Sequence, residues 1–215
     1  MSAHPSTTLQ RRESRRQVME TALRLSARIG HRKTTVADIA RELSMSPANV
    51  YRFYRSKRAI DEAVACELLQ ETLVNAIEAA RAAGSAGERL RGVLRAIERS
   101  HTGRLANQKL HDLVATAGRE GWRVVLEHRR RMTRIVGWVI ASGQMRGELR
   151  SGDPTVLARC VLAALDGHCN LPTPADTATA RPTLEQIIDF CLSAIRAAPA
   201  PSGQAADRRM HASLH

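Results

Sequence analysis

The chain has 215 residues, of which 43% are hydrophobic and 25% are charged, a balance typical of a globular protein and not of a disordered one. Aromatic residues make up only 3% of it, which favours helices over sheets. The sequence contains no apolar run of about 18 residues and no apolar segment near its N-terminus. We therefore expect neither a transmembrane helix nor a signal peptide, and we expect a cytoplasmic protein.

The formal net charge of +12 is concentrated near the N-terminus. Residues 1–58 contain thirteen Lys and Arg but four Asp and Glu, which leaves a net charge of +9 in about a quarter of the chain. Such a concentration predicts a polyanionic partner, although a solvated Arg-rich surface would have the same composition. The four cysteines form no CxxC pair and the histidines have no ligand spacing, so we expect no metal, disulfide or cofactor.

The segment 35–57 predicts two short helices joined by a tight turn. Thr35 followed by Asp38 matches a capping box, and the apolar residues after Thr35 recur at helical spacing. Ser46 is suited to cap the next helix, whose first residue is Pro47. This arrangement predicts a helix–turn–helix, in which one helix braces a second helix that contacts base edges.

Three short motifs in this segment resemble the tetracycline-repressor (TetR) family of bacterial regulators. They are TTVxDIA at residues 34–40, SPxxVY at 46–51 and YxSK at 54–57. The chain departs from the family pattern at Ser44, where the turn usually has Gly, which adopts a left-handed backbone more readily.

The rest of the chain predicts an all-α protein of roughly nine helices, with a three-helix helix–turn–helix domain followed by a larger helical domain. The resemblance implies that this second domain is an effector-binding and dimerisation domain. Gly30 is expected to end the first helix, and a long fourth helix is expected to join the two domains. The predicted regions are a disordered arm (1–10), the DNA-binding domain (11–58), the effector-binding and dimerisation domain (59–198) and a disordered tail (199–215). The later helices are predicted at 56–83, 86–101, 107–119, 122–142, 153–171 and 183–198.

Candidate DNA-contacting residues fall into two groups. Thr35, Tyr51 and Lys57 are predicted to contact phosphates, which supply affinity but no sequence preference. Asn49 and Arg52 are predicted to read bases, because Asn can bond adenine and Arg can bond guanine through two hydrogen bonds. Thymine methyl groups are the expected contacts of Pro47 and Ala48. Packing in the three-helix core is the alternative for each aromatic residue here, and we favour it for Phe53 and Tyr54.

The resemblance also implies a small-molecule effector and a homodimer. Each candidate effector-binding residue is more often a plain core residue; the candidates are Leu113, Trp122, Leu126, Trp138 and His168. Two apolar stripes in the last two helices are implied to form a four-helix dimer interface, with completion of the subunit's own core as the alternative. These stripes comprise Leu157, Val161, Leu165, Leu184, Ile187, Ile188, Cys191 and Ile195.

Taken together, these features predict a ligand-responsive dimeric transcriptional regulator, most simply a repressor, that binds a palindromic double-stranded operator. Its expected partners are DNA, a second copy and a small effector, and no membrane. A transcriptional activator and a non-specific nucleoid-type DNA-binding protein are the alternatives. An enzyme is not expected, because the sequence has no nucleophile elbow, phosphate loop or metal motif.

Overall fold

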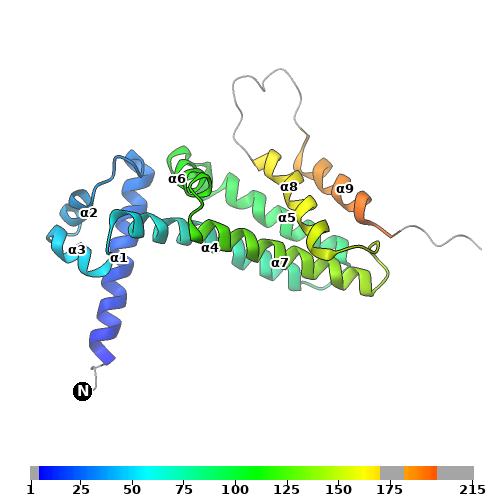
Figure 1. The fold of residues 1–215 in the computed structure, drawn as a ribbon, viewed down its shortest axis with the longest axis horizontal. Coiled ribbons are helices and arrows are strands. Elements are labelled where there is room, and N and C mark those ends of the chain that lie inside the picture. Colours follow the sequence, from blue (N-terminus) through cyan, green and yellow to red (C-terminus); the bar gives the residue numbers. More distant parts are fainter. Residues whose placement is uncertain (1–4, 170–181, 198–215) are drawn as a thin grey trace, which may run out of the picture.

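The computed structural model describes residues 5–169 and 182–197, which are almost entirely helical (Figure 1). Within these residues one isolated bridge, between Leu149 and Arg196, is the only β pairing. The elements are α1 (Pro5–Ile29), α2 (Val36–Glu42), α3 (Pro47–Phe53), α4 (Lys57–Arg81), α5 (Ala86–Thr102), the 3₁₀ turn η1 (Arg104–Ala106), α6 (Gln108–Arg119), α7 (Arg123–Met145), α8 (Pro154–Cys169) and α9 (Leu184–Ile195).

The fold confirms the predicted all-α class and most of the helix boundaries. Gly30 has a φ of +92° and follows the end of α1, as expected for a left-handed cap. Ser85 and Thr183 form capping boxes at the starts of α5 and α9. One prediction differs, because α1 begins at Pro5 and residues 5–10 are helical, although they were predicted to belong to a disordered arm. The predicted tail at 199–215 and the end of the helix at 153–171 lie outside the described residues.

The first hydrophobic core joins the three N-terminal helices to the beginning of α4. Val18 from α1, Ile39 from α2 and Val50 from α3 are completely buried together with Ile60 from α4. This core does not end at the predicted boundary at residue 58. It continues through Leu113 in α6 and into other residues of η1, α6 and the start of α7, namely Leu105, Leu110, Ala117, Trp122 and Val125.

The second hydrophobic core lies among α4, α5, α7, α8 and α9, away from the N-terminal helices (Figure 1). Leu73 and Ala76, in the second half of α4, pack in this core, whereas Val64 and Leu68, in the first half, pack in the first core. At 1.5 Å per residue, the 25 residues of α4 span roughly 37 Å. A single continuous helix therefore carries apolar side chains into both cores.

The second core overturns part of the predicted dimer interface. Five of the eight candidate residues there have their side chains at most 4% exposed within the single subunit, and Leu157 is 7% exposed. The other two, Leu184 and Ile187, are partly buried against the same core. The two stripes thus complete the subunit's own core, which was the alternative, because α8 and α9 pack their most apolar faces against α5 and α7. The five residues are Val161, Leu165, Ile188, Cys191 and Ile195.

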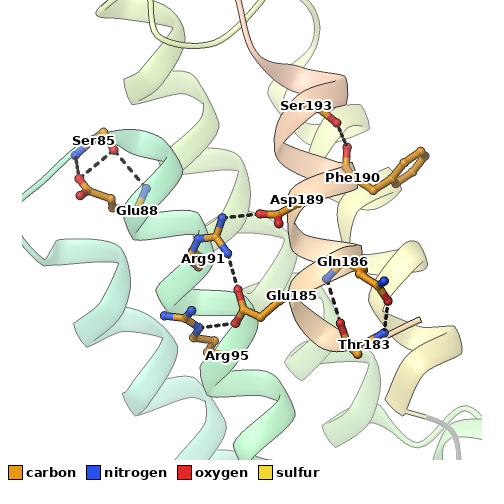
Figure 2. Close-up of polar contacts among 10 residues, drawn as sticks. All are labelled: Ser85, Glu88, Arg91, Arg95, Thr183, Glu185, Gln186, Asp189, Phe190 and Ser193. Carbon is orange, nitrogen blue, oxygen red and sulfur yellow. Dashed lines mark hydrogen bonds and ion pairs between the residues drawn. The ribbon is translucent and has the colours of Figure 1, made fainter. Parts of the chain in front are cut away.

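Ion pairs fix α9 along α5 on the side away from its exposed face (Figure 2). Arg91 donates to the carboxylates of Glu185 and Asp189, and Arg95 donates to Glu185 at 2.8 Å. The aromatic ring of Phe190 points away from α5 in Figure 2 and is 68% exposed. The ion pairs and the apolar contacts together fix which face of α9 is presented to solvent.

We expect Gly143→Ala to destabilise the fold by about 1–3 kcal/mol, because α7 passes α5 too closely for an added methyl group. A Cβ at Gly143 would lie 2.5 Å from the Cβ of Ala86 and 2.7 Å from Cδ1 of Leu149. Gly137→Ala on the same helix is the control, since its nearest neighbour would be the Pro154 carbonyl oxygen at 3.6 Å. Urea unfolding measures both variants, and an equal loss in the two would contradict this account.

Candidate nucleic-acid interface

The N-terminus of α2 is fixed by a complete capping box. The Asp38 backbone N–H donates to the Thr35 hydroxyl oxygen at 3.1 Å, and the Thr35 N–H donates to the Asp38 carboxylate at 3.0 Å. The hydrogen bonds that the Thr35 hydroxyl and the Thr35 backbone N–H donate to its carboxylate hold the pKa of Asp38 below its usual range. The Thr35 hydroxyl also donates to Asp38, at 2.6 Å, so the side chain predicted to contact phosphate is engaged within the cap.

The turn between α2 and α3 places Ser44 in a left-handed conformation, with a φ of +53°. Of the described residues other than glycine, Ser44 is the only one with positive φ, at the position where the sequence lacks the usual Gly. The turn is held by a hydrogen bond of 2.9 Å from the Met45 N–H to the Ala40 carbonyl. The Ser46 side chain then accepts from the Asn49 N–H at 3.2 Å and starts α3, as predicted.

The outer face of α3 presents the residues that were predicted to contact bases. Val50 is completely buried, whereas Pro47 and Ala48 are exposed. Asn49 and Arg52 are exposed one turn apart, and the Arg52 guanidinium donates to the Asn49 side-chain oxygen at 3.4 Å. Tyr51 is 49% exposed on the same short helix. The five exposed side chains therefore form one surface of α3, and α1 and α2 pack against the opposite side of the helix.

Tyr54, at the end of α3, packs in the core as predicted, and contacts with Arg15 that the sequence did not predict brace the same end. Tyr54 is 4% exposed, and its hydroxyl donates to the Arg15 carbonyl at 3.2 Å. Burial raises the pKa of Tyr54 above its usual range. The Arg15 guanidinium lies 4.3 Å from the Tyr54 ring centre and donates to the Phe53 carbonyl at 3.1 Å. Arg15 thus holds the C-terminus of α3. From the sequence alone, an arginine in the first helix would be expected either to contact a phosphate or to be solvated.

Lys57 is engaged inside the subunit. Its ammonium group donates to the His31 carbonyl at 3.1 Å and to the Asp61 carboxylate at 2.5 Å. Burial raises the pKa of Asp61, which is 7% exposed, while the Lys57 ammonium opposes that shift. The side chain predicted to contact phosphate therefore joins α4 to the loop after α1, and the i,i+4 spacing of Lys57 and Asp61 was the signal for this pairing.

The five candidate effector-binding residues do not lie around one cavity. Leu113 and Trp122 are buried in the first core, and Leu126 is on the surface. Trp138 alone of the five lines a groove of about 540 Å³ between α4 and α7. The five candidate residues are separated because the side chains of nearby residues on α6 and α7 pack in different cores.

His168 lies instead among histidines from other helices. The charges of His111 and His168 both act on His101, and the charge of His101 acts on His128. Burial is the main cause that lowers the pKa of His101, and it lowers that of His128 to about 4, with help from Arg129 and Arg131. In the described residues, no group of three or more His, Cys, Asp or Glu has the arrangement of a metal site.

The fold and this surface define an all-α helix–turn–helix regulator with a separate helical C-terminal region. Residues 18–64 match the model of bacterial regulatory proteins of the tetR family, and residues 86–188 match that of a tetracyclin repressor-like C-terminal domain. The chain therefore belongs to the TetR family of DNA-binding transcriptional regulators. Family membership confirms the prediction of a regulator and not an enzyme.

Solved structures share the fold at low sequence identity. A TetR/AcrR-family regulator from Thermobifida fusca is 24% identical, with a TM-score of 0.65 over 84% of this chain and 95% of that chain. A tetR-family protein from Rhodococcus RHA1 is 21% identical, with a TM-score of 0.62 over 86% and 98%. A protein with unknown function from Rhodococcus sp. RHA1 is 18% identical, with a TM-score of 0.69 over 85% and 95%. A search of curated sequences gives no match.

None of the described helices is long and apolar enough to cross a membrane.

We expect the free energy of unfolding to decrease as the pH is lowered from about 7 to 4, in part because of His128. Its pKa is about 4 in the folded chain and 6.5 in an exposed histidine, so in this range the unfolded chain binds the extra proton. The contribution of His128 is up to about 3 kcal/mol. Urea titrations at several pH values should show a smaller decrease for His128→Asn than for the unaltered chain. Identical pH profiles would contradict the burial of a neutral His128.

Proposed function

We propose that the chain is a homodimeric repressor that binds a palindromic operator through α3 and leaves it when a small effector binds. The observation that carries this proposal is the exposed, capped α3, on which Asn49 and Arg52 lie one turn apart. The basic excess of residues 1–58 supports attraction to the phosphate backbone, and the side chains on α3 supply the base selectivity. Thr35 at the start of α2, Tyr51 and the first turn of α4 at Lys57 are the proposed phosphate contacts.

Two copies are needed because a helix of seven residues covers few base pairs. In a two-fold dimer, the two α3 helices would enter successive major grooves about 34 Å apart. The faces of α8 and α9 that remain exposed support an interface there. Val156 on α8 is 53% exposed and Phe190 on α9 is 68% exposed, whereas the neighbouring apolar side chains are covered by α5 and α7. This interface replaces the one predicted from the buried stripes.

The shared helix α4 supports a route from effector to DNA. Its second half packs in the second core, and its first half packs in the first core against α1, which in turn contacts α2 and α3. A shift of one half of α4 therefore displaces the other half. An effector that binds more tightly to the displaced arrangement would change the distance between the two α3 helices, so that it no longer matches the spacing of successive major grooves. A difference in affinity of about 1–3 kcal/mol between the two arrangements is typical of such coupling.

Arg52→Ala should relax the preference at one base pair of each half-site, by about 1–3 kcal/mol, and change affinity for random DNA little. Tyr51→Phe is the comparison, because loss of a phosphate contact should weaken all sequences alike. An operator is first selected from a randomised duplex pool, and binding is then measured on every single-base variant of it. Equal losses for Arg52→Ala on all duplexes would contradict base reading and favour the non-specific nucleoid-type alternative.

Phe190→Glu should weaken self-association by at least about tenfold, because a buried interface aromatic is replaced by a charge. The control is Leu126→Glu, which places the same charge at an exposed apolar position on α7. Analytical ultracentrifugation measures both, and circular dichroism verifies that both remain helical. The interface assigned to α8 and α9 would be wrong if the Phe190 variant dimerised as tightly as the control.

Transcription in vitro from a template carrying the selected operator separates repression from activation. Fewer transcripts on addition of the chain support the proposed repressor, and more transcripts favour the activator alternative. The experiment uses the full chain, because both proposed functions require the dimer.

A further inference from the structure

The groove between α4 and α7 has an apolar floor formed by two facing stripes. Leu73, Ile77 and Ala80 lie at helical spacing on α4, and Ile135 and Trp138 lie opposite them on α7. The volume of about 540 Å³ is in the range of small-molecule sites in proteins. Trp138 lines this groove and is 52% exposed, so part of its aromatic surface is available to a ligand, although the Arg89 guanidinium lies 5.5 Å from its ring centre.

Three arginines surround the same groove. Arg81 comes from the end of α4, and Arg131 and Arg134 come from one turn of α7. Arg131 and Arg134 both contact the carboxylate of Glu127, at 3.1 and 3.4 Å, so one acidic side chain faces two guanidinium groups there. Because no ion pair in the described residues involves Arg81, the rim has an excess of positive charge.

We infer that this groove binds a small amphiphile whose apolar tail lies on the floor and whose anionic head group is held by the arginines. Arginine binds carboxylate and similar anions through paired hydrogen bonds, and here it stands beside an apolar surface that water covers poorly. A second copy of the chain fits this groove less well, because two-fold pairing would bring both sets of three arginines together. One molecule with an anionic end and an apolar end would pair with the arginines of the rim and also cover the apolar floor.

The position of the groove gives the ligand a regulatory effect, and this part of the inference rests on the proposed function. The groove is lined by the second half of α4, whose first half packs against α1, the helix that contacts both α2 and α3. A tail inserted between α4 and α7 increases their separation and moves α4 relative to the second core. The same amphiphile is then the effector that lowers affinity for operator DNA.

The test uses decanoate as the probe, below the concentration at which it forms micelles, and Trp138 fluorescence as the signal. Trp122→Phe leaves Trp138 as the only tryptophan of the chain, and calorimetry on the unaltered chain verifies that this background binds alike. Decanoate should change the fluorescence saturably. Butanoate, which has the head group without the tail, and decyltrimethylammonium, which has the tail with the opposite charge, should have no effect at the same concentrations.

Arg81→Gln and Arg134→Gln should each weaken decanoate binding by about threefold to tenfold. Arg130→Gln is the matched control, since Arg130 is exposed on α7 but does not line the groove. Equal losses for Arg130 and Arg134, or equal binding of the cationic amphiphile, would overturn the inference. A Trp138 signal that changes on dilution without any probe would also overturn it, because a second copy would then cover the groove.

Binding to the selected operator duplex is measured with and without decanoate. A loss of operator affinity that Arg134→Gln weakens and Arg130→Gln does not supports the effector role. Decanoate binding without any change in operator affinity would overturn that role. If the chain binds no duplex at all, the proposed function fails, while the fluorescence result still decides whether the groove takes an amphiphilic anion.

Discussion

The structure depends on the burial of one helix, α4, in two hydrophobic cores. Val64 and Leu68 pack in the first core, where α4 contacts α1, and Leu73 and Ala76 pack in the second core, where α4 contacts α5 and α7. A continuous α-helix transmits a tilt along its length, since its backbone hydrogen bonds resist bending. The first core also extends into α6 and the start of α7, so α1 touches the C-terminal region at a second place, through α6. The two regions are therefore mechanically joined and not merely linked in sequence.

The parts of this fold that could be predicted from the sequence are those set by residues close in the chain. A capping box at Thr35, a proline after Ser46 and a left-handed Gly30 each depend on contacts within three or four residues, and each is present. The exposed face of α3 follows in the same way, because the burial of Val50 fixes the rotation of a helix of only seven residues.

The remaining features depend on contacts between distant segments. An apolar stripe shows that a helix face is covered, but not what covers it, so Ile188 and Val161 were assigned to a partner and are buried within the subunit. Likewise, Arg15 meets Phe53 and Tyr54 across 38 and 39 positions of sequence, which no local pattern reveals. The effector candidates are scattered for the same reason, since α6 and α7 turn residues of similar character toward different surroundings.

The arginine contacts that attach α9 to α5 have a consequence for how salt acts on this protein. Arg91 and Arg95 pair with carboxylates that are 45% exposed at Glu185 and 65% exposed at Asp189, and mobile ions screen such pairs. If α9 forms the subunit contact, raising the ionic strength weakens the attachment of α9 to α5. It also weakens the proposed electrostatic attraction to nucleic acid. A plot of operator affinity against salt would then have two contributions, and the number of phosphates inferred from its slope would be too large.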